Sequence, residues 1–169
     1  MTAPADRTIV ADIVEGTPDG RPPLVLLHGP ASDRSTWGLA LAELCRIDPG
    51  RQVLSLDLPG HGGSAPWPHY DTDSVTDAVH AAVAWTRLRP PVVVGHATGA
   101  LIAMHYAVRH PVLGVVNVDQ WLVEPFLVPI QFAAGPDSGH VPHLARPARF
   151  AACLAATARW SATPGSGLP

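Results

Sequence analysis

Short apolar runs alternate with segments of helical periodicity along most of this chain. A continuously apolar run suits a strand that is buried on both faces, whereas apolar residues three or four apart suit a helix that packs on one side. The predicted buried strands are residues 23–28, 52–58, 91–95 and 112–119, and the predicted helices are residues 36–47, 73–88, 97–110 and 147–160. Strands separated by helices of this length form right-handed βαβ units. We therefore expect an α/β fold with a mostly parallel sheet and helices on both faces.

Two further strands are predicted at the margins of this pattern. Residues 8–14 alternate between apolar and polar side chains, which is typical of an edge strand, and residues 126–132 form one more plausible strand. Asp73 and Ser74 are the expected N-terminal caps of the helix over residues 73–88. The buried face of that helix is expected to carry Val75, Val79, Ala82 and Trp85.

The composition is that of a globular protein and offers no sign of a nucleic-acid or membrane partner. Of the 169 residues, 47% are hydrophobic and 15% charged, and the net charge is −3 with no run of Lys or Arg. No signal peptide and no apolar stretch of membrane-spanning length is visible. We expect one domain over residues 1–160, a flexible tail over residues 161–169, a cytoplasmic location, and buried, reduced thiols at Cys45 and Cys153.

Unusual sequences follow the predicted buried strands, at the edge of a parallel sheet where ligands bind. Each of the four strands is followed by one such sequence, and another precedes the last helix. In chain order they are HGPASDRSTW, DLPGHGGS, GHATGA, NVDQWL and PDSGHVPHL. One of them alone would carry little weight, but all five in this order are specific.

Taken together, these motifs resemble those of the α/β-hydrolase family, over about residues 8–160 with one large gap. The matching segments are the oxyanion loop at His28-Gly29, the D-x-x-G-x-G-x-S loop at residues 57–64, the nucleophile elbow at residues 95–99, and the catalytic-histidine loop at residues 139–144. The stretch from Asp119 to His140 is too short for a cap domain plus the remaining strand and helix of the family. The resemblance therefore implies a fold without its cap and without part of its C-terminal sheet.

The elbow departs from the family pattern at the position that matters most. An elbow lifts one strained residue above the sheet, and Gly95 and Gly99 leave room for the backbones to pass. The residue lifted here is Ala97, where the family has its nucleophile serine. In the oxyanion hole the Thr98 N–H is the expected donor, but Pro30 has no N–H to supply the second one. Because the family uses both donors, this loss is expected to slow acyl transfer further.

The resemblance also assigns a histidine and its acid. His140 is the expected general base because it lies in a Gly-rich loop that presents a side chain rather than packing it. Asp119 ends a strand beside the elbow strand, a place that a minority of the family uses for the acid. Asp57 is expected to hold its loop through backbone amides rather than to act in catalysis. The expected pocket residues are His28, Gly29, His96 and Trp121, with His96 packing or hydrogen bonding beside the elbow.

We expect neither a metal nor a cofactor. His140 and His143 are three residues apart, and His105 and His110 share a predicted helix, but no second cluster at ligand spacing accompanies them. The phosphate-binding patterns G-x-G-x-x-G and Walker A are both absent. The expected partner is a small-molecule substrate or ligand.

Three functions fit these residues. The first is a hydrolase-family protein, similar to ester and acyl hydrolases, whose activity is lost or strongly reduced by Ala97 through natural degeneration or Ser-to-Ala engineering. Pro30 and the short middle region favour degeneration. The second is an enzyme like the cofactor-independent dioxygenases of this family, with a dyad of His140 and Asp119. The third is a non-catalytic binding module whose exposed apolar surface serves a partner or self-association.

Overall fold

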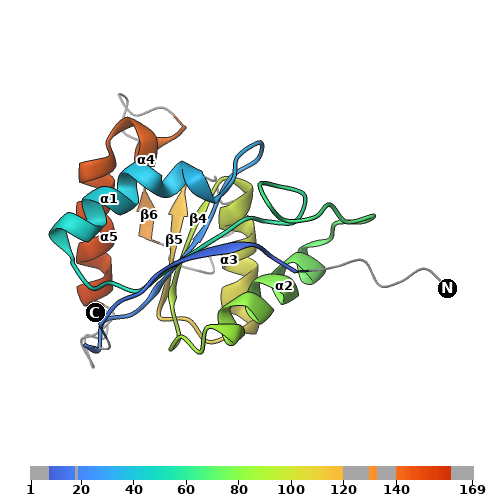
Figure 1. The fold of residues 1–169 in the computed structure, drawn as a ribbon, viewed down its shortest axis with the longest axis horizontal. Coiled ribbons are helices and arrows are strands. Elements are labelled where there is room, and N and C mark those ends of the chain that lie inside the picture. Colours follow the sequence, from blue (N-terminus) through green and yellow to red (C-terminus); the bar gives the residue numbers. More distant parts are fainter. Residues whose placement is uncertain (1–7, 18, 120–129, 133–139, 161–169) are drawn as a thin grey trace.

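The computed structural model describes residues 8–17, 19–119, 130–132 and 140–160. In these ranges a central sheet is flanked by helices (Figure 1). The elements are β1 (Ala11–Val14), β2 (Leu24–Leu27), the 3₁₀ turn η1 (Arg34–Trp37), α1 (Gly38–Ile47), β3 (Val53–Leu56), α2 (Thr72–Trp85), β4 (Val92–His96), α3 (Thr98–Arg109), β5 (Gly114–Val118), β6 (Ile130–Phe132), α4 (Pro142–Ala145) and α5 (Pro147–Trp160). The predicted α/β class is confirmed.

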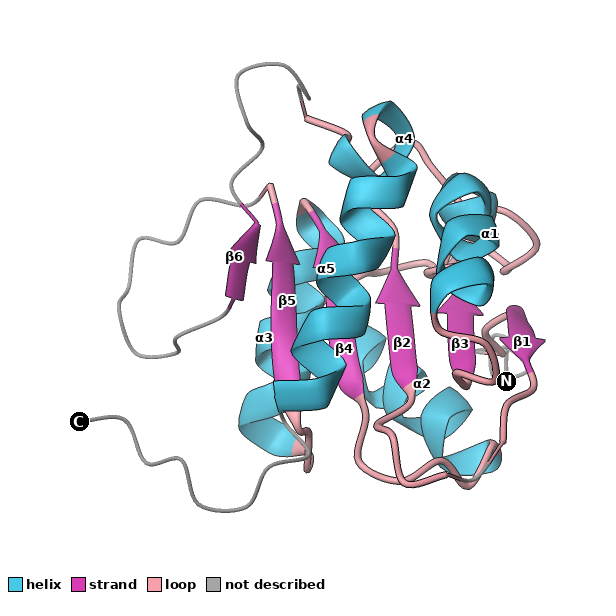
Figure 2. Cartoon of the chain, turned by 90° about the vertical axis from the view of Figure 1, so that its left-hand side faces the viewer, coloured by secondary structure: helices cyan, strands magenta, loops and turns pink. Residues whose placement is uncertain are grey.

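The sheet has the strand order β1-β3-β2-β4-β5-β6. All neighbours pair in parallel except β1, which runs antiparallel to β3 at the edge, where the alternating pattern of residues 8–14 predicts a strand. Of the strand predicted over residues 126–132, the structure describes only β6. The carboxyl ends of the parallel strands point to one edge of the sheet, near α4 (Figure 2).

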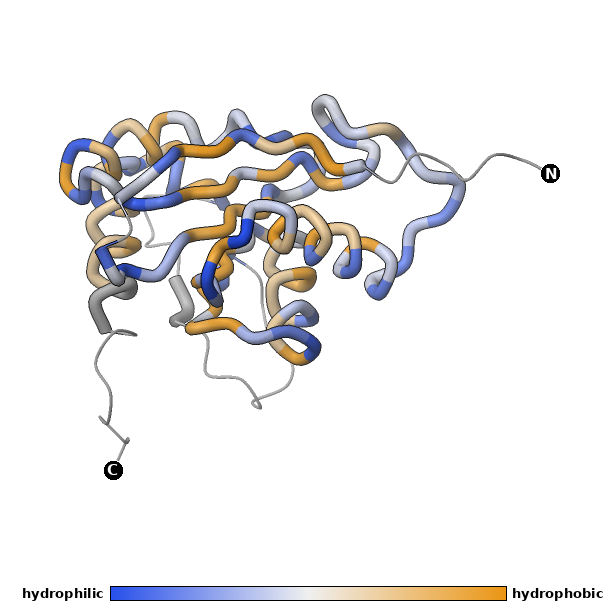
Figure 3. The backbone as a smooth tube through the Cα atoms, turned by 60° about the horizontal axis from the view of Figure 1, so that its bottom comes forward, coloured by the Kyte–Doolittle hydropathy of each residue, from blue (hydrophilic) through white to orange (hydrophobic). Residues whose placement is uncertain are grey.

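Helices cover both faces of the sheet, which explains why the central strands are apolar without interruption. In Figure 2, α1, α4 and α5 lie in front of the sheet and α2 and α3 lie behind it. Successive residues of β2 face opposite sides: Leu24 and Leu26 enter the core beneath α1 and α5, while Val25 and Leu27 enter the core beneath α2 and α3. Hydrophobic residues accordingly concentrate along the strands in Figure 3, and hydrophilic residues along the outer loops.

The structure corrects two predictions about α2. Its cap is Asp71, whose side chain accepts a hydrogen bond from the Ser74 N–H, so the helix begins before Asp73. Trp85 is 78% exposed rather than buried. The buried stripe instead ends at Val83, and a residue two positions further lies on nearly the opposite side of a helix with 3.6 residues per turn.

The two cysteines are free, but they are not buried as predicted: Cys45 is exposed and Cys153 is half-buried. Both occupy helices, where the residue beside a buried position turns toward the helix flank; Cys45, for example, follows the buried Leu44. In the part of the chain that the structure describes, no helix is both long and apolar enough to cross a bilayer.

Candidate active site

The turn between β4 and α3 has the strained geometry of a nucleophile elbow. Ala97 has φ 48° and ψ −118°, a conformation that L-residues rarely adopt. Its N–H donates to the Val118 carbonyl at 2.9 Å, and its carbonyl accepts from the Ala100 N–H at 2.9 Å. The bend is therefore held by the neighbouring strand on one side and by the first turn of α3 on the other.

Both elbow glycines are required by close backbone packing. A Cβ at Gly95 would lie 2.3 Å from the Gly99 carbonyl oxygen, and a Cβ at Gly99 would lie 2.4 Å from the His28 carbonyl oxygen. These distances are far below contact range, so only glycine fits at either position. The second contact also seats α3 directly against the loop that begins at His28.

His140 and Asp119 meet at the same edge of the sheet. Asp119 directly follows β5, the neighbour of β4, and its Oδ2 lies 2.5 Å from Nδ1 of His140. The His140 side chain is 94% exposed and the Asp119 side chain 18% exposed. Because the carboxylate can only accept, Nδ1 of His140 carries a proton, and in the neutral ring Nε2 is then the nitrogen that can accept one.

Asp119 itself adopts a positive φ of 57°. Aspartate tolerates this left-handed conformation better than most residues do. The backbone therefore turns sharply at the end of β5, and this turn accompanies the approach of the carboxylate to the histidine loop. The arrangement that the resemblance implies, an acid after this strand and a histidine before the last helices, is present in the structure.

The expected pocket residues divide into different roles. His28 is completely buried: its Nδ1 donates to the Gly29 carbonyl at 2.8 Å, and its Nε2 accepts from the Leu58 N–H at 2.9 Å. Desolvation lowers the pKa of this imidazole, so it stays neutral. His28 thus joins two loops through its ring, and its place in a substrate pocket stays a prediction. Gly29 is also buried, and Trp121 lies outside the described residues.

The two residues assigned to the oxyanion hole differ in what their backbones can donate. Thr98 is the first residue of α3, so its N–H is at the positive end of the helix dipole. Pro30 is exposed at the turn after Gly29, and the next residue, Ala31, has a positive φ of 54°. A proline at this turn cannot donate from its backbone, so this loop lacks the donor that the family commonly takes from it.

Asp57 organises the second loop, in agreement with its expected structural role. The carboxylate is fully buried, accepts from the Arg34 N–H and the Gly63 N–H at 2.7 Å each, and pairs with the Arg34 guanidinium. The Ser64 hydroxyl donates to the Asp57 carbonyl at 2.8 Å. Both carboxylate oxygens therefore have structural partners, and Asp57 is not available for proton transfer.

His96 bonds to the backbone of His140, and His143 packs against the His96 ring, a role that sequence reasoning did not find. His96 is 9% exposed, and its Nε2 donates to the His140 carbonyl at 2.6 Å. His143 is fully buried, with Nε2 3.1 Å from the Thr36 hydroxyl. Its sequence signals are its place in the histidine-loop motif, residues 139–144, and its spacing of three from His140, which does not by itself predict a metal site. Among the described residues no three His, Cys, Asp or Glu side chains form a group that could hold a metal.

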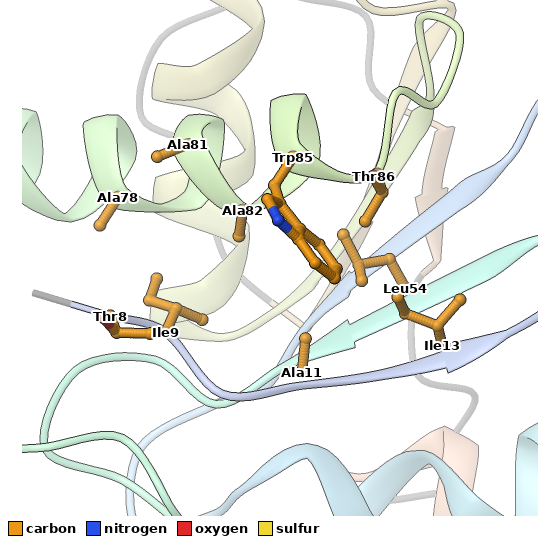
Figure 4. Close-up of a pocket in the computed structure, with 10 residues that line it drawn as sticks. All are labelled: Thr8, Ile9, Ala11, Ile13, Leu54, Ala78, Ala81, Ala82, Trp85 and Thr86. Atoms are coloured by element: carbon orange, nitrogen blue, oxygen red, sulfur yellow. The ribbon is translucent and has the colours of Figure 1, made fainter.

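A cavity of about 650 Å³ lies away from these residues, between α2 and β1 (Figure 4). Apolar side chains dominate its wall, and Trp85 projects along it from the end of α2. The lining residues are Thr8, Ile9, Ala11, Ile13, Leu54, Ala78, Ala81, Ala82, Trp85 and Thr86. None of them can act as an acid, base or ordinary nucleophile at neutral pH, so this cavity is not the candidate active site.

A strained elbow, a histidine–aspartate pair and a mostly parallel sheet define an α/β-hydrolase-type scaffold. Residues 24–135 match the profile described as "Alpha/beta hydrolase family". The chain therefore belongs to the alpha/beta hydrolase family, as the motifs indicate.

Similar proteins differ in their named reactions. The chain is 38% identical over 96 residues to a pimeloyl-[acyl-carrier protein] methyl ester esterase of Chromobacterium violaceum, covering 53% of this chain and 33% of that protein. It is 31% identical over 99 residues to a 2-succinyl-6-hydroxy-2,4-cyclohexadiene-1-carboxylate synthase of Klebsiella pneumoniae, covering 59% and 38%. The chain thus spans about a third of the length of these curated relatives.

Solved structures show the same fold. A "predicted CIB-like hydrolase" from Thermoplasma acidophilum superposes with a TM-score of 0.69 at 16% identity, over 90% of this chain and 98% of that one. A bromoperoxidase from Bacillus anthracis superposes with a TM-score of 0.58 at 25% identity, over 66% and 40%. The first match shows that a fold of nearly this extent occurs in another chain.

Proposed function

We propose that this protein carries an ester- or acyl-hydrolase type of site whose covalent mechanism is disabled at position 97, so that hydrolysis is lost or strongly reduced. The observation that carries the proposal is Ala97 at φ 48° in the elbow. A serine mechanism needs a hydroxyl oxygen there to attack the carbonyl carbon, and a methyl group has no electron pair to donate. The named activity of the Chromobacterium violaceum esterase supports an ester as the ancestral substrate class.

The histidine–aspartate pair supports the proposal, because it can supply the acid–base part of such a mechanism. Asp119 holds His140 with Nδ1 protonated, so Nε2 of the neutral ring can take a proton from a bound ligand or a water molecule. In serine hydrolases, removing one member of the catalytic group leaves about 10³–10⁴-fold acceleration over water from the remaining groups. With Pro30 also lacking a donor, we place the hydrolysis that this chain retains below that residual level.

Restoring the nucleophile tests the proposal. We expect Ala97→Ser to hydrolyse p-nitrophenyl acetate with a burst of p-nitrophenolate that matches the enzyme concentration, while the unaltered chain shows no burst. The His140→Ala change in the Ala97→Ser background should remove the burst, and Ala84→Ser, on the exposed side of α2, is the matched control. Robust turnover by the unaltered chain would defeat the proposal.

A second substitution examines the oxyanion loop. In the Ala97→Ser background, Pro30→Ala restores a backbone N–H, and one oxyanion donor is worth about 10²–10³ in rate. We expect kcat/KM for the ester to rise by about 10²-fold. No change in kcat/KM would show that this loop does not contact the developing negative charge.

The 2.5 Å bond between His140 and Asp119 favours a second candidate, a cofactor-independent dioxygenase-like reaction. Here His140 Nε2 would take the hydroxyl proton of a 3-hydroxy-4-quinolone. The anion would add dissolved oxygen across C2 and C4, and the C2–C3 and C3–C4 bonds would break, so that C3 leaves as carbon monoxide and the proton returns to the N-acylanthranilate product. No serine is needed in this chemistry. Oxygen consumption with such a quinolone measures it directly. Consumption that persists after His140→Ala and Asp119→Ala would refute a role of the dyad.

A further inference from the structure

The imidazole of His140 is poorly held by its own surroundings. Its side chain is 94% exposed, so packing does not fix the ring, and Asp119 restrains only its Nδ1. The position of the ring therefore depends on how its backbone is anchored. A shift of about 1 Å in such a group can cost about 10²-fold in rate.

The backbone of His140 is anchored by the residue that precedes the elbow position. His96 Nε2 lies 2.6 Å from the His140 carbonyl oxygen. A carbonyl only accepts, so His96 Nε2 carries a proton and donates it to this bond. His96 ends β4 and is 9% exposed, which makes this a shielded bond from a rigid strand.

The other side of the His96 ring is fixed by Gly29. A Cβ at Gly29 would lie 2.5 Å from His96 Nδ1 and 3.0 Å from Cε1, so a larger residue there would displace the ring. The His96 imidazole thus lies between the oxyanion loop at Gly29 and the histidine loop at His140, next to Ala97 in the chain. It ties together the three loops that must be in register for acyl transfer.

His143 restrains the same histidine loop through its contacts with His96 and Trp37. Its ring lies edge-on to that of His96, with centroids 4.9 Å apart, and it packs on Trp37 with centroids 4.4 Å apart. Desolvation, with a smaller contribution from His96, lowers its pKa to about 4, so the His143 ring is neutral at physiological pH and packs without a charge. Because His143 lies in α4, immediately after the loop, it limits how far residue 140 can move.

We propose that His96 is the positioning residue of this site: its Nε2–H bond to the His140 carbonyl, aimed by Gly29, sets the distance between the His140 imidazole and Asp119. The inference rests on the proposed function for its use in catalysis, but the geometry it predicts can be measured without any activity. A residue that merely filled space beside the elbow would make no difference to the protonation pattern of His140.

Replacing His96 with glutamine or with asparagine, two amides of different length, distinguishes a positioning role from simple space filling. In His96→Gln the amide nitrogen reaches the place of the imidazole Nε2 and can still donate, whereas in His96→Asn it falls short. The measurement is a long-range ¹H–¹⁵N correlation spectrum of the histidine rings, with His140 assigned through His140→Ala. It reports which nitrogen of His140 carries the proton and at what pH the ring titrates.

We expect the unaltered chain and His96→Gln to show His140 protonated at Nδ1 and bonded to Asp119. In His96→Asn the ring should shift to the tautomer mixture of a free, solvated histidine. Gly29→Ala, which leaves His96 in place but pushes its ring away, should give the same change as His96→Asn. Gly38→Ala, where nothing lies within 4 Å of the added Cβ, is the matched control.

The same variants in the Ala97→Ser background connect geometry to rate. His96→Asn should lower kcat for the ester by about 10-fold or more with little change in KM, and His96→Gln should restore most of it. If Ala97→Ser shows no esterase activity, the proposed function fails while the spectra still test the positioning role. The positioning role is overturned if His140 keeps its Nδ1 proton and its titration in both His96→Asn and folded Gly29→Ala, or if His96→Gln and His96→Asn behave alike.

Discussion

Replacing Ala97 with glycine should stabilise the protein, which is the reverse of what this substitution does at an ordinary alanine. The residue has φ 48° and ψ −118°, a region that is costly for any side chain with a Cβ. Backbone strain of this kind costs about 1–3 kcal/mol. Glycine releases it, but the greater freedom of glycine in the unfolded chain takes back about 0.4–1 kcal/mol. The net gain in the free energy of unfolding is therefore about 1 kcal/mol.

Thermal and urea denaturation followed by circular dichroism can measure this gain. In a domain of this size, about 1 kcal/mol raises Tm by roughly 2–4 °C. Ala84→Gly is the matched control because Ala84 is exposed in the regular helix α2, where the same change costs about 1 kcal/mol. If Ala97→Gly lowers Tm as much as Ala84→Gly does, residue 97 is not strained and the elbow geometry is wrong.

Other substitutions test the packing around the site. Burial holds the pKa of His143 at about 4, below the 6.5 of an unfolded chain, so the unfolded state takes up the proton first and stability falls as the pH drops through this interval. The free energy of unfolding should fall by about 3 kcal/mol by pH 4, and His143→Gln should not show this fall when its urea unfolding is measured over the same pH range. Equal dependence of the unfolding free energy on pH in the two proteins would refute this reasoning. Gly99→Ala places a Cβ 2.4 Å from a backbone carbonyl and should cost about 1–3 kcal/mol or more, whereas Gly38→Ala meets nothing and should cost none; equal denaturation midpoints would contradict the elbow packing. Asp57→Ala leaves a partly buried guanidinium and two backbone amides without their acceptor and should cost about 3–5 kcal/mol, so an unchanged midpoint would show that the loop does not depend on this carboxylate.

The fold and the elbow could be predicted because both depend on local patterns. Uninterrupted apolar runs mark strands that are covered on both faces, and glycines two residues on either side of Ala97 mark a turn that no larger residue could make. The pairing of Asp119 with His140 was predictable from the family resemblance, which assigns both residues. It agrees with the rule that the ends of parallel strands, and the loops that follow them, meet at one edge of the sheet.

Features that depend on which helix face or loop meets which neighbour were harder to predict. Trp85 follows the apolar spacing of α2 loosely, but the stripe that packs on the sheet ends at Val83 and the indole points away. The sequence places His28 and His96 beside the site and predicts that His96 packs or forms a hydrogen bond there. Their partners, the Leu58 N–H and the His140 carbonyl, lie in other loops, and sequence spacing does not reveal such contacts.

Covalent labelling of position 97 tests the central claim most directly. A fluorophosphonate reacts with a serine only where an elbow and a histidine base activate it, and peptide mass spectrometry locates the adduct. We predict no adduct on the unaltered chain, a single adduct on residue 97 in Ala97→Ser, and its loss when His140→Ala is added. A folded Ala97→Ser protein that stays unlabelled, or that is labelled equally well without His140, would contradict the claim that residue 97 occupies a nucleophile position served by that histidine.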